Sequence, residues 1–138
     1  MVSAGVLSTS DVFAANALDA RTAKLASFFK AHQCPEPFHA AEYVAAADMY
    51  SMDYRLLPAV SVRESTCGLH QRLNNFWGWD SARTGFESVG RGIHYILSQL
   101  AWGRFYRGKS LDQKLHMYNP NPQYVHEVRE LMREIDAD

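Results

Sequence analysis

The segment DYRLLPAVSVRESTCG, residues 53–68, contains the helix on which both the fold and the chemistry of this chain depend. Apolar residues three and four positions apart predict a helix over residues 54–67 that ends before a glycine. Glu64 falls on the same face as Leu57 and Val60. Because burial disfavours a charged carboxylate, this position should raise the pKa of Glu64 and suit it to act as a general acid.

The helix is followed by NNFWGW, residues 74–79, where aromatic rings alternate with side-chain amides. Aromatic faces can stack on sugar rings, and amides can hydrogen-bond hydroxyl and acetamido groups. Each feature has a structural alternative: Glu64 could pair with Arg55 or Arg91, and the aromatic loop could merely cover a small core. Together, the acid and the loop favour a cleft that binds a glycan.

Helical periodicity extends through most of the chain and predicts a mainly α protein of about six helices. Residues 70–87 lack this periodicity and are expected to form an irregular lobe or a minimal β-hairpin. Residues 1–138 should form one domain, with residues 1–15 as a flexible N-terminal extension. The helices are expected at about 16–32, 38–50, 54–67, 89–102, 111–118 and 122–135.

Length and composition exclude several classes of protein. A chain of 138 residues with 47% hydrophobic residues can bury about two-thirds of its unfolded surface without a metal or a disulfide framework. A net charge of -1 argues against a nucleic-acid partner, and no apolar run approaches the roughly 18 residues of a membrane span. The N-terminus shows no intact signal peptide. We expect a monomer.

The charges are unevenly distributed. Residues 54–111 carry a net charge of +5, whereas the segments before and after carry -3 each. The only acids of this basic middle segment are Glu64, Asp80 and Glu87. Each of the three is therefore a candidate for a specific role, with a solvated surface acid as the alternative.

The two cysteines and six histidines allow two further interpretations. The histidines show no metal-site spacing, so neither a metal nor a cofactor is expected. Cys67 could be a nucleophile with His70 or His116 as its base, as in a wall peptidase. In an exported protein Cys34 and Cys67 could instead form a disulfide, and two free buried thiols are equally consistent with the sequence.

Four fragments follow one another along the chain: Glu64-Ser65-Thr66-Cys67-Gly68, Asn75-Phe76-Trp77-Gly78-Trp79, Phe86 with Ser88, and Tyr118-Asn119-Pro120 with Tyr124. In this order they resemble the bacterial endo-β-N-acetylglucosaminidases, a family of the lysozyme-like superfamily that includes autolysins. The resemblance covers residues 53–135 and implies a lysozyme-like α+β fold, export to the cell envelope and β-1,4 cleavage of peptidoglycan by hydrolysis or lytic transglycosylation.

The resemblance also implies roles for individual residues. Glu64 would be the general acid, and Tyr118 would lean over the reaction centre. In the family the tyrosine is usually followed by a small residue, Thr and Asp before a proline, whereas here Asn119 and Pro120 follow at once. This departure places the role of Asn119 in doubt more than that of Tyr118. The expected substrate-binding residues are Ser65, Asn75, Trp77, Trp79, Asp80 and Asn119.

A second carboxylate is the least defined part of the expected site. Two-acid glycosidases place their carboxyl groups about 5–5.5 Å apart for retention or about 6.5–9.5 Å apart for inversion. Glu87 is slightly favoured over Asp80, because alternation after Phe86 turns it away from that ring. If neither is positioned, the substrate acetamido group or a sugar 6-hydroxyl could replace it. A lysozyme-like module that holds glycan without cutting it is the remaining alternative.

Overall fold

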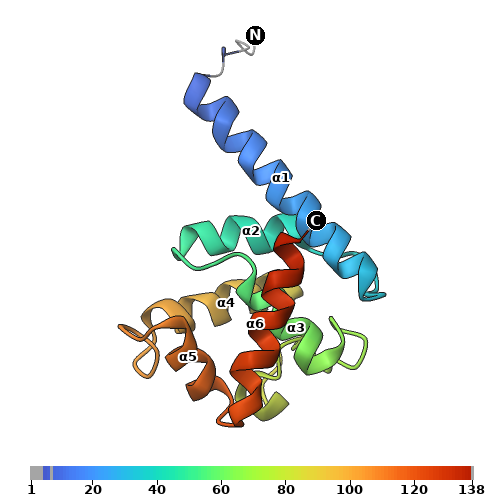
Figure 1. Cartoon of the computed structure of the whole chain (residues 1–138), viewed down its shortest axis with the longest axis vertical. Coiled ribbons are helices and arrows are strands. Elements are labelled where there is room, and N and C mark those ends of the chain that lie inside the picture. Colours follow the sequence, from blue (N-terminus) through green and yellow to red (C-terminus); the bar gives the residue numbers. More distant parts are fainter. Residues whose placement is uncertain (1–4, 7, 138) are drawn as a thin grey trace.

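The computed structural model of the chain describes residues 5–6 and 8–137. These residues contain six α-helices and one short 3-10 helix, and their one β-type pairing is an isolated bridge between Arg72 and Asn75. The predicted mainly α class is confirmed. The elements are α1 (Thr9–Ala31), α2 (Ala40–Met49), α3 (Leu56–Ser65), η1 (Trp79–Ala82), α4 (Val89–Trp102), α5 (Leu111–Tyr118) and α6 (Pro122–Asp136) (Figure 1).

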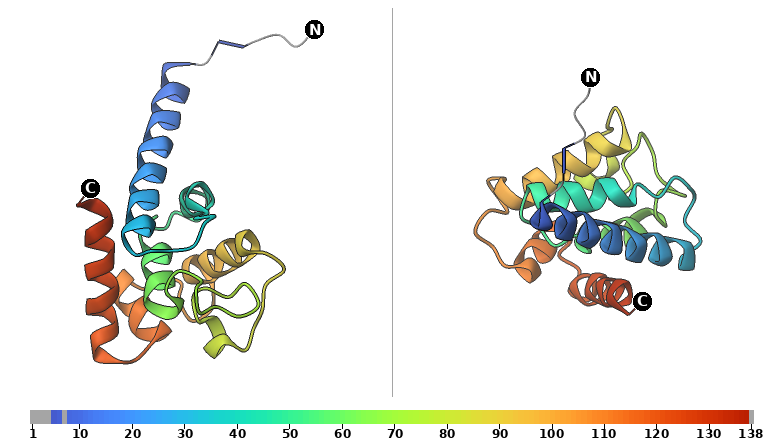
Figure 2. Two further views of the ribbon diagram at one scale, coloured as in Figure 1. Left: turned by 90° about the vertical axis from the view of Figure 1, so that its right-hand side faces the viewer. Right: turned by 90° about the horizontal axis from the view of Figure 1, so that it is seen from above.

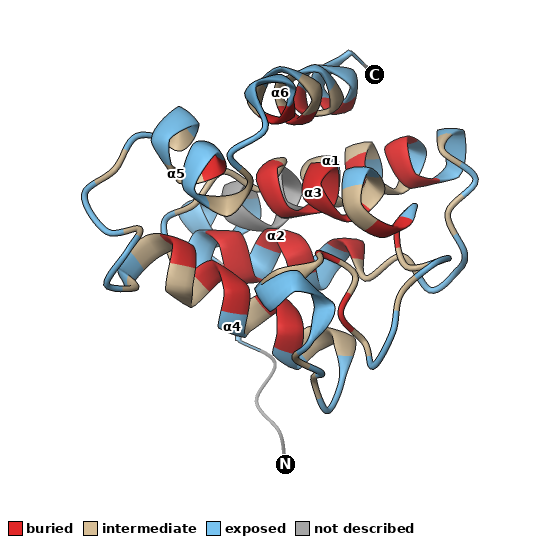
Figure 3. Ribbon diagram, turned by 90° about the horizontal axis from the view of Figure 1, so that it is seen from below, coloured by how far each residue is buried: buried red, intermediate tan, exposed pale blue. Residues whose placement is uncertain are grey.

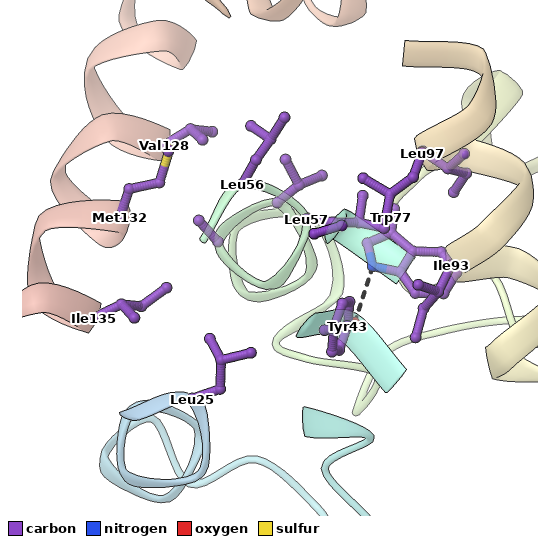
Figure 4. Packing of buried hydrophobic residues seen from close by; sticks show 14 of the residues in the cluster. Leu25, Tyr43, Leu56, Leu57, Trp77, Ile93, Leu97, Val128, Met132 and Ile135 are labelled. Atoms are coloured by element: carbon purple, nitrogen blue, oxygen red, sulfur yellow. Dashed lines mark hydrogen bonds between the residues drawn. The ribbon is translucent and has the colours of Figure 1, made fainter. Parts of the chain in front are cut away.

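Helix α3 lies in the centre of the helical body, between α6 on one side and α4 on the other (Figure 3). Leu56 and Leu57 are each 1% exposed and point into the space between these neighbours, with Val128 of α6 on one side and Ile93 of α4 on the other (Figure 4). Burial of such a side chain contributes roughly 1.5–3 kcal/mol. The helix that carries Glu64 is therefore fixed by core packing along most of its length.

The first helix begins earlier than the sequence pattern predicts. The Ser8 hydroxyl accepts a hydrogen bond from the Asp11 N–H, and the Asp11 carboxylate accepts from the Ser8 N–H, which forms a capping box before Thr9. Residues 9–15 are thus part of the helix, which was expected to begin at about residue 16, while residues 1–4 and 7 of the expected N-terminal extension lie outside the described part. The N-terminal half of α1 extends away from the other helices (Figures 1 and 2).

The last three helices begin and end at or within one residue of the positions expected from the sequence. Ser88 caps α4, and Ser110 forms a capping box with Gln113 at the start of α5. Residues 70–87 are irregular as expected, with η1 as their only helical turn. Helix α3 is shorter than predicted, because Thr66 adopts a left-handed conformation at φ 52° and ends the helix. No helix among residues 5–6 and 8–137 is long and apolar enough to cross a membrane.

Candidate active site

Glu64 lies in the last turn of α3 and lines an open cleft of about 740 Å³. The loop that contains η1 forms one wall of this cleft. The connection between α4 and α5, together with the chain that follows α5, contributes much of the remainder. The lining residues are Glu64, Gly78, Trp79, Asp80, Ser81, Thr84, Tyr95, Phe105, Tyr106, Tyr118, Asn119 and Pro120. The acid and the aromatic loop that the sequence singled out therefore meet in one place.

The turn after Glu64 fixes the end of α3. The Ser65 side chain is buried; its hydroxyl donates to the Phe76 carbonyl and accepts from the Gly68 N–H. Cys67 is bonded to Cys34 in a disulfide with its Cα atoms 5.5 Å apart. Ser65 thus connects the helix to the aromatic loop, which corrects its predicted role as a substrate-binding residue. Cys67 has no free thiol and cannot serve as a peptidase nucleophile in this structure.

The environment of Glu64 favours its protonated form. Burial raises the pKa of the Glu64 carboxyl above its ordinary value of 4.5, against smaller lowering effects of the Tyr124 hydroxyl and of Arg63. Arg63 is largely engaged elsewhere, because its guanidinium forms an ion pair with Glu127 and lies 5.6 Å from the centre of the Tyr124 ring. Glu64 therefore has the raised pKa expected of a general acid, and none of the predicted ion pairs neutralises it.

Tyr124 is the partner of Glu64 that the motif alone did not identify. Its ring is buried in the core and stacks on Tyr118 with a centroid separation of 6.1 Å. Its hydroxyl makes no hydrogen bond of good geometry, yet it faces Glu64 closely enough that burial and the Glu64 charge raise the Tyr124 pKa. The phenol therefore stays protonated beside the carboxyl. The helix predicted over residues 122–135 includes Tyr124 but does not indicate this neighbour.

Asn75 organises the loop beneath the cleft. Its side-chain nitrogen donates to the carbonyls of Trp79 and Thr84, and its side-chain oxygen accepts from the N–H groups of Trp77 and Trp79. With 3% exposure, the amide has no polar atom left for a ligand. The prediction that Asn75 binds substrate is corrected: the residue shapes the loop, as a buried and fully bonded amide does.

The two tryptophans of the loop have different places. Trp77 is fully buried and its indole N–H donates to the Tyr43 hydroxyl at 3.1 Å (Figure 4). It is a core residue and does not form the cleft wall, contrary to the prediction. Trp79 is partly exposed in the cleft, 5.8 Å from the Tyr118 ring and 6.0 Å from the Tyr106 ring. Trp79 is therefore the indole that can stack on a sugar.

Gly78, between these tryptophans, is required by the close approach of Glu64. A Cβ atom at this position would lie 2.8 Å from Glu64 Oε2, and the backbone has a positive φ of 64°. Both observations exclude a larger residue without displacement. The missing side chain allows the loop backbone to lie against the carboxyl group.

Tyr118 and Asn119 lie in the cleft as predicted. The Tyr118 hydroxyl donates to the Trp77 carbonyl, so it links the end of α5 to the loop opposite. Burial raises the pKa of Tyr118 well above its ordinary value, which keeps it protonated. The Asn119 side-chain oxygen accepts from the Asn121 N–H at 3.0 Å, which fixes the turn before α6.

Of the two candidate second acids, the structure brings only Asp80 into the cleft with Glu64. Asp80 accepts hydrogen bonds from Thr84 and Arg83, and these contacts lower its pKa, whereas burial raises the pKa of Glu64. Glu87 is 81% exposed and pairs with Arg91 at 3.4 Å. The preference for Glu87 is therefore corrected in favour of Asp80.

Glu87 belongs to a second pocket of about 720 Å³ on the other side of Tyr95, which also includes His94 and Tyr50. His94 Nδ1 and the Tyr50 hydroxyl are hydrogen-bonded at 3.2 Å. Tyr95 lines both pockets and so separates them. Sequence reasoning missed Tyr95, Phe105 and Tyr106 as lining residues, although the last two stand as adjacent aromatics in an otherwise basic loop.

The site has the components for acid catalysis without a metal ligand set. Among residues 5–6 and 8–137, no group of three or more His, Cys, Asp or Glu side chains could hold a metal ion. A proton donor of raised pKa, an ionised carboxylate and exposed aromatic rings share one cleft. No protein-family model, curated protein or solved structure matches the chain significantly.

Proposed function

We propose that this protein is a glycosidase that cleaves β-1,4 bonds in peptidoglycan glycan strands, with Glu64 as general acid. The observation that carries the proposal is the half-buried Glu64 carboxyl, whose pKa is raised, in an aromatic cleft of about 740 Å³. The ordered motifs of the glucosaminidases support the same activity. A lysozyme-like arrangement of the helices is part of this proposal.

The proposed chemistry follows from the opposite pKa shifts of Glu64 and Asp80 in the cleft. Protonated Glu64 donates its proton to the glycosidic oxygen as the bond from that oxygen to the anomeric carbon breaks. The leaving sugar departs as a neutral alcohol, and positive charge develops on the ring that remains. Attack by water, followed by return of a proton to Glu64, completes hydrolysis. Attack by the sugar 6-hydroxyl would instead give an anhydro product.

Asp80 is the second carboxylate of the proposed mechanism. Because the Arg83 and Thr84 contacts lower its pKa, Asp80 carries a negative charge at neutral pH and can stabilise the positive charge on the sugar ring. The substrate acetamido group is the alternative stabiliser. Asp80→Asn separates the two: rate loss assigns the role to Asp80, and an unchanged rate assigns it to the acetamido group.

The substrate and the location follow from the same site. Trp79 and Tyr118 offer aromatic faces to sugar rings, and Asn119 lies at the cleft for polar contact with hydroxyl or acetamido groups. Export to the cell envelope is supported by the Cys34–Cys67 disulfide, because such bonds persist in oxidising compartments.

The decisive test is Glu64→Gln assayed on purified cell walls. We expect the rate of wall cleavage to fall by about 100-fold or more, the range that general acid catalysis contributes. Glu87→Gln is the matched control, because it makes the same change in a carboxylate outside the cleft and should leave the rate unchanged. Equal rates for Glu64→Gln and wild type would overturn the proposal. Mass spectrometry of the released fragments identifies the bond cut and the new sugar end.

A glycan-binding module without activity is the second candidate. It is favoured by one observation: within the described cleft, Asp80 is the only carboxylate besides Glu64, and it is exposed. Binding of wall fragments with no new reducing or anhydro ends, after long incubation with wild-type protein, would select this candidate.

A further inference from the structure

The connection between α4 and α5, residues 103–110, is the most basic short segment of the chain. Its sequence GRFYRGKS contains Arg104, Arg107 and Lys109 and no acid. Arg104 and Arg107 are exposed, and Lys109 is partly exposed. The positive charge of this connection therefore faces solvent.

Elsewhere in the basic middle segment, most charges are compensated by neighbouring carboxylates. Arg55 pairs with Asp53 and Asp136, and Arg63 pairs with Glu127. Arg83 pairs with Asp80 at 3.0 Å, and Arg91 pairs with Glu87 at 3.4 Å. The positive charge of the middle segment is thus largely cancelled at these residues.

The three bases of the connection have no such compensation in the described part of the chain. The Arg104 guanidinium lies 5.6 Å from the centre of the Phe105 ring, and Lys109 Nζ donates to the Phe105 carbonyl at 2.6 Å. Neither contact neutralises a positive charge. Both contacts hold a basic side chain next to Phe105.

Phe105 and its neighbour Tyr106 line the cleft of Glu64, and Phe105 is 63% exposed there. Arg104 and Arg107 flank these two lining residues in the chain and therefore stand at the rim of the cleft, whereas Lys109 lines a separate pocket with Asp112 and Met117. The described lining residues on the opposite wall include Asp80, whose charge is already paired with Arg83. The unpaired charge of the rim is consequently positive.

We propose that Arg104 and Arg107, the basic rim of the cleft, bind the carboxylates of the peptide stems carried by a glycan strand lying in the cleft. The inference rests on the proposed function and names the form of its substrate: a stem-bearing strand and not a neutral one. Stem carboxylates are attached to the sugars themselves, so a strand in the cleft brings them to its rim. Arginine forks match carboxylate geometry, and exposed charges act mainly on encounter and salt dependence.

The experiment measures binding with Arg104→Glu/Arg107→Glu in the Glu64→Gln background, so that the strand is not consumed. The ligands are stem-bearing strands stripped of phosphate polymers, and uncharged N-acetylglucosamine oligomers. Lys24→Glu/Lys30→Glu on α1 is the control, since it changes the net charge equally. At about 50 mM salt we expect roughly tenfold weaker binding to stem-bearing strands, from several exposed ion pairs lost or reversed. The neutral oligomers should bind within about twofold of the parent, and the control should change neither ligand.

Three results would overturn the inference: unchanged binding of stem-bearing strands, an equal loss for neutral oligomers, or a loss confined to walls that keep their phosphate polymers. The last would assign the rim to phosphate and not to carboxylate. Failure of the proposed function is recognised separately, because wild type would then cut no strand. If wild type cuts no strand, but the arginine variant still weakens the binding of stem-bearing strands more than that of neutral oligomers, the rim is still supported as the carboxylate site.

Discussion

Removal of the Cys34–Cys67 disulfide should lower the stability of the protein substantially without touching its hydrophobic core residues other than Cys67. The bond joins residues 33 positions apart, from the connection after α1 to the turn after α3. In the chain-entropy description, a loop of this length stabilises the folded state by about 3–4 kcal/mol at 25 °C. For a domain of this size, that corresponds to a melting temperature roughly 10–14 °C lower.

Removal of the disulfide should also affect Glu64, the proposed catalytic acid. Thr66 and Cys67, which follow Glu64 closely in the chain, both adopt positive φ angles, and the Cys67 N–H donates to the Ser61 carbonyl at 2.9 Å. Without the covalent link, this turn loses one of its restraints. We therefore expect the rate of wall cleavage to fall at temperatures where the variant is still folded.

The assay is urea unfolding and thermal melting of wild type and Cys34→Ala/Cys67→Ala, each with and without reductant. Wild type should lose stability on reduction, whereas the alanine variant should not respond to reductant. Thiol titration of unfolded, unreduced wild type should find no free thiol. A difference below about 1 kcal/mol between the two proteins, far under the loop-closure value, would show that the bond does not stabilise the fold in this way.

Three further predictions concern the cleft. Because burial raises the folded pKa of Glu64, the protein is stabilised below the ordinary glutamate pKa and loses that contribution as pH rises through the folded value. Glu64→Gln should therefore raise the urea midpoint at pH 7, with the gain disappearing below about pH 4. Gly78→Ala should cost about 1–2 kcal/mol, because an alanine is strained at the positive φ of 64°, and it should lower activity, because its Cβ displaces Glu64 Oε2; wild-type activity and stability would contradict this. Trp77→Ala should cost about 3–5 kcal/mol, whereas Trp79→Ala should mainly weaken glycan binding; calorimetric melting and binding titration separate them, and the reverse pattern would refute the assignment.

Local signals allowed most helices to be predicted from the sequence. Ser88 and Ser110 are side-chain caps, and their effect depends on hydrogen bonds within three residues. Glu64 could be placed on the core-facing side of its helix for the same reason, since helical periodicity is local. The start of α1 was missed because Ser8 and Asp11 precede a segment with weak apolar periodicity.

The roles of the loop residues could be decided only by the tertiary structure. Trp77 and Trp79 are two positions apart in one motif, yet one fills the core against Tyr43 and the other faces the cleft. Irregular backbone has no fixed period, so nothing in the sequence states which ring points inward. The same holds for Asp80 and Glu87, whose separation from Glu64 in space depends on how the loop returns.

The helices, the buried face of α3 and the acid on that face could thus be predicted from spacing along a regular backbone. Which residues meet around that acid depends on how the helices and loops pack in three dimensions. Tyr124 approaches Glu64 from a helix sixty positions later, and the Arg104 connection reaches the same cleft from α4. Such neighbours are set by the packing of helices against one another, which spacing along the chain does not record.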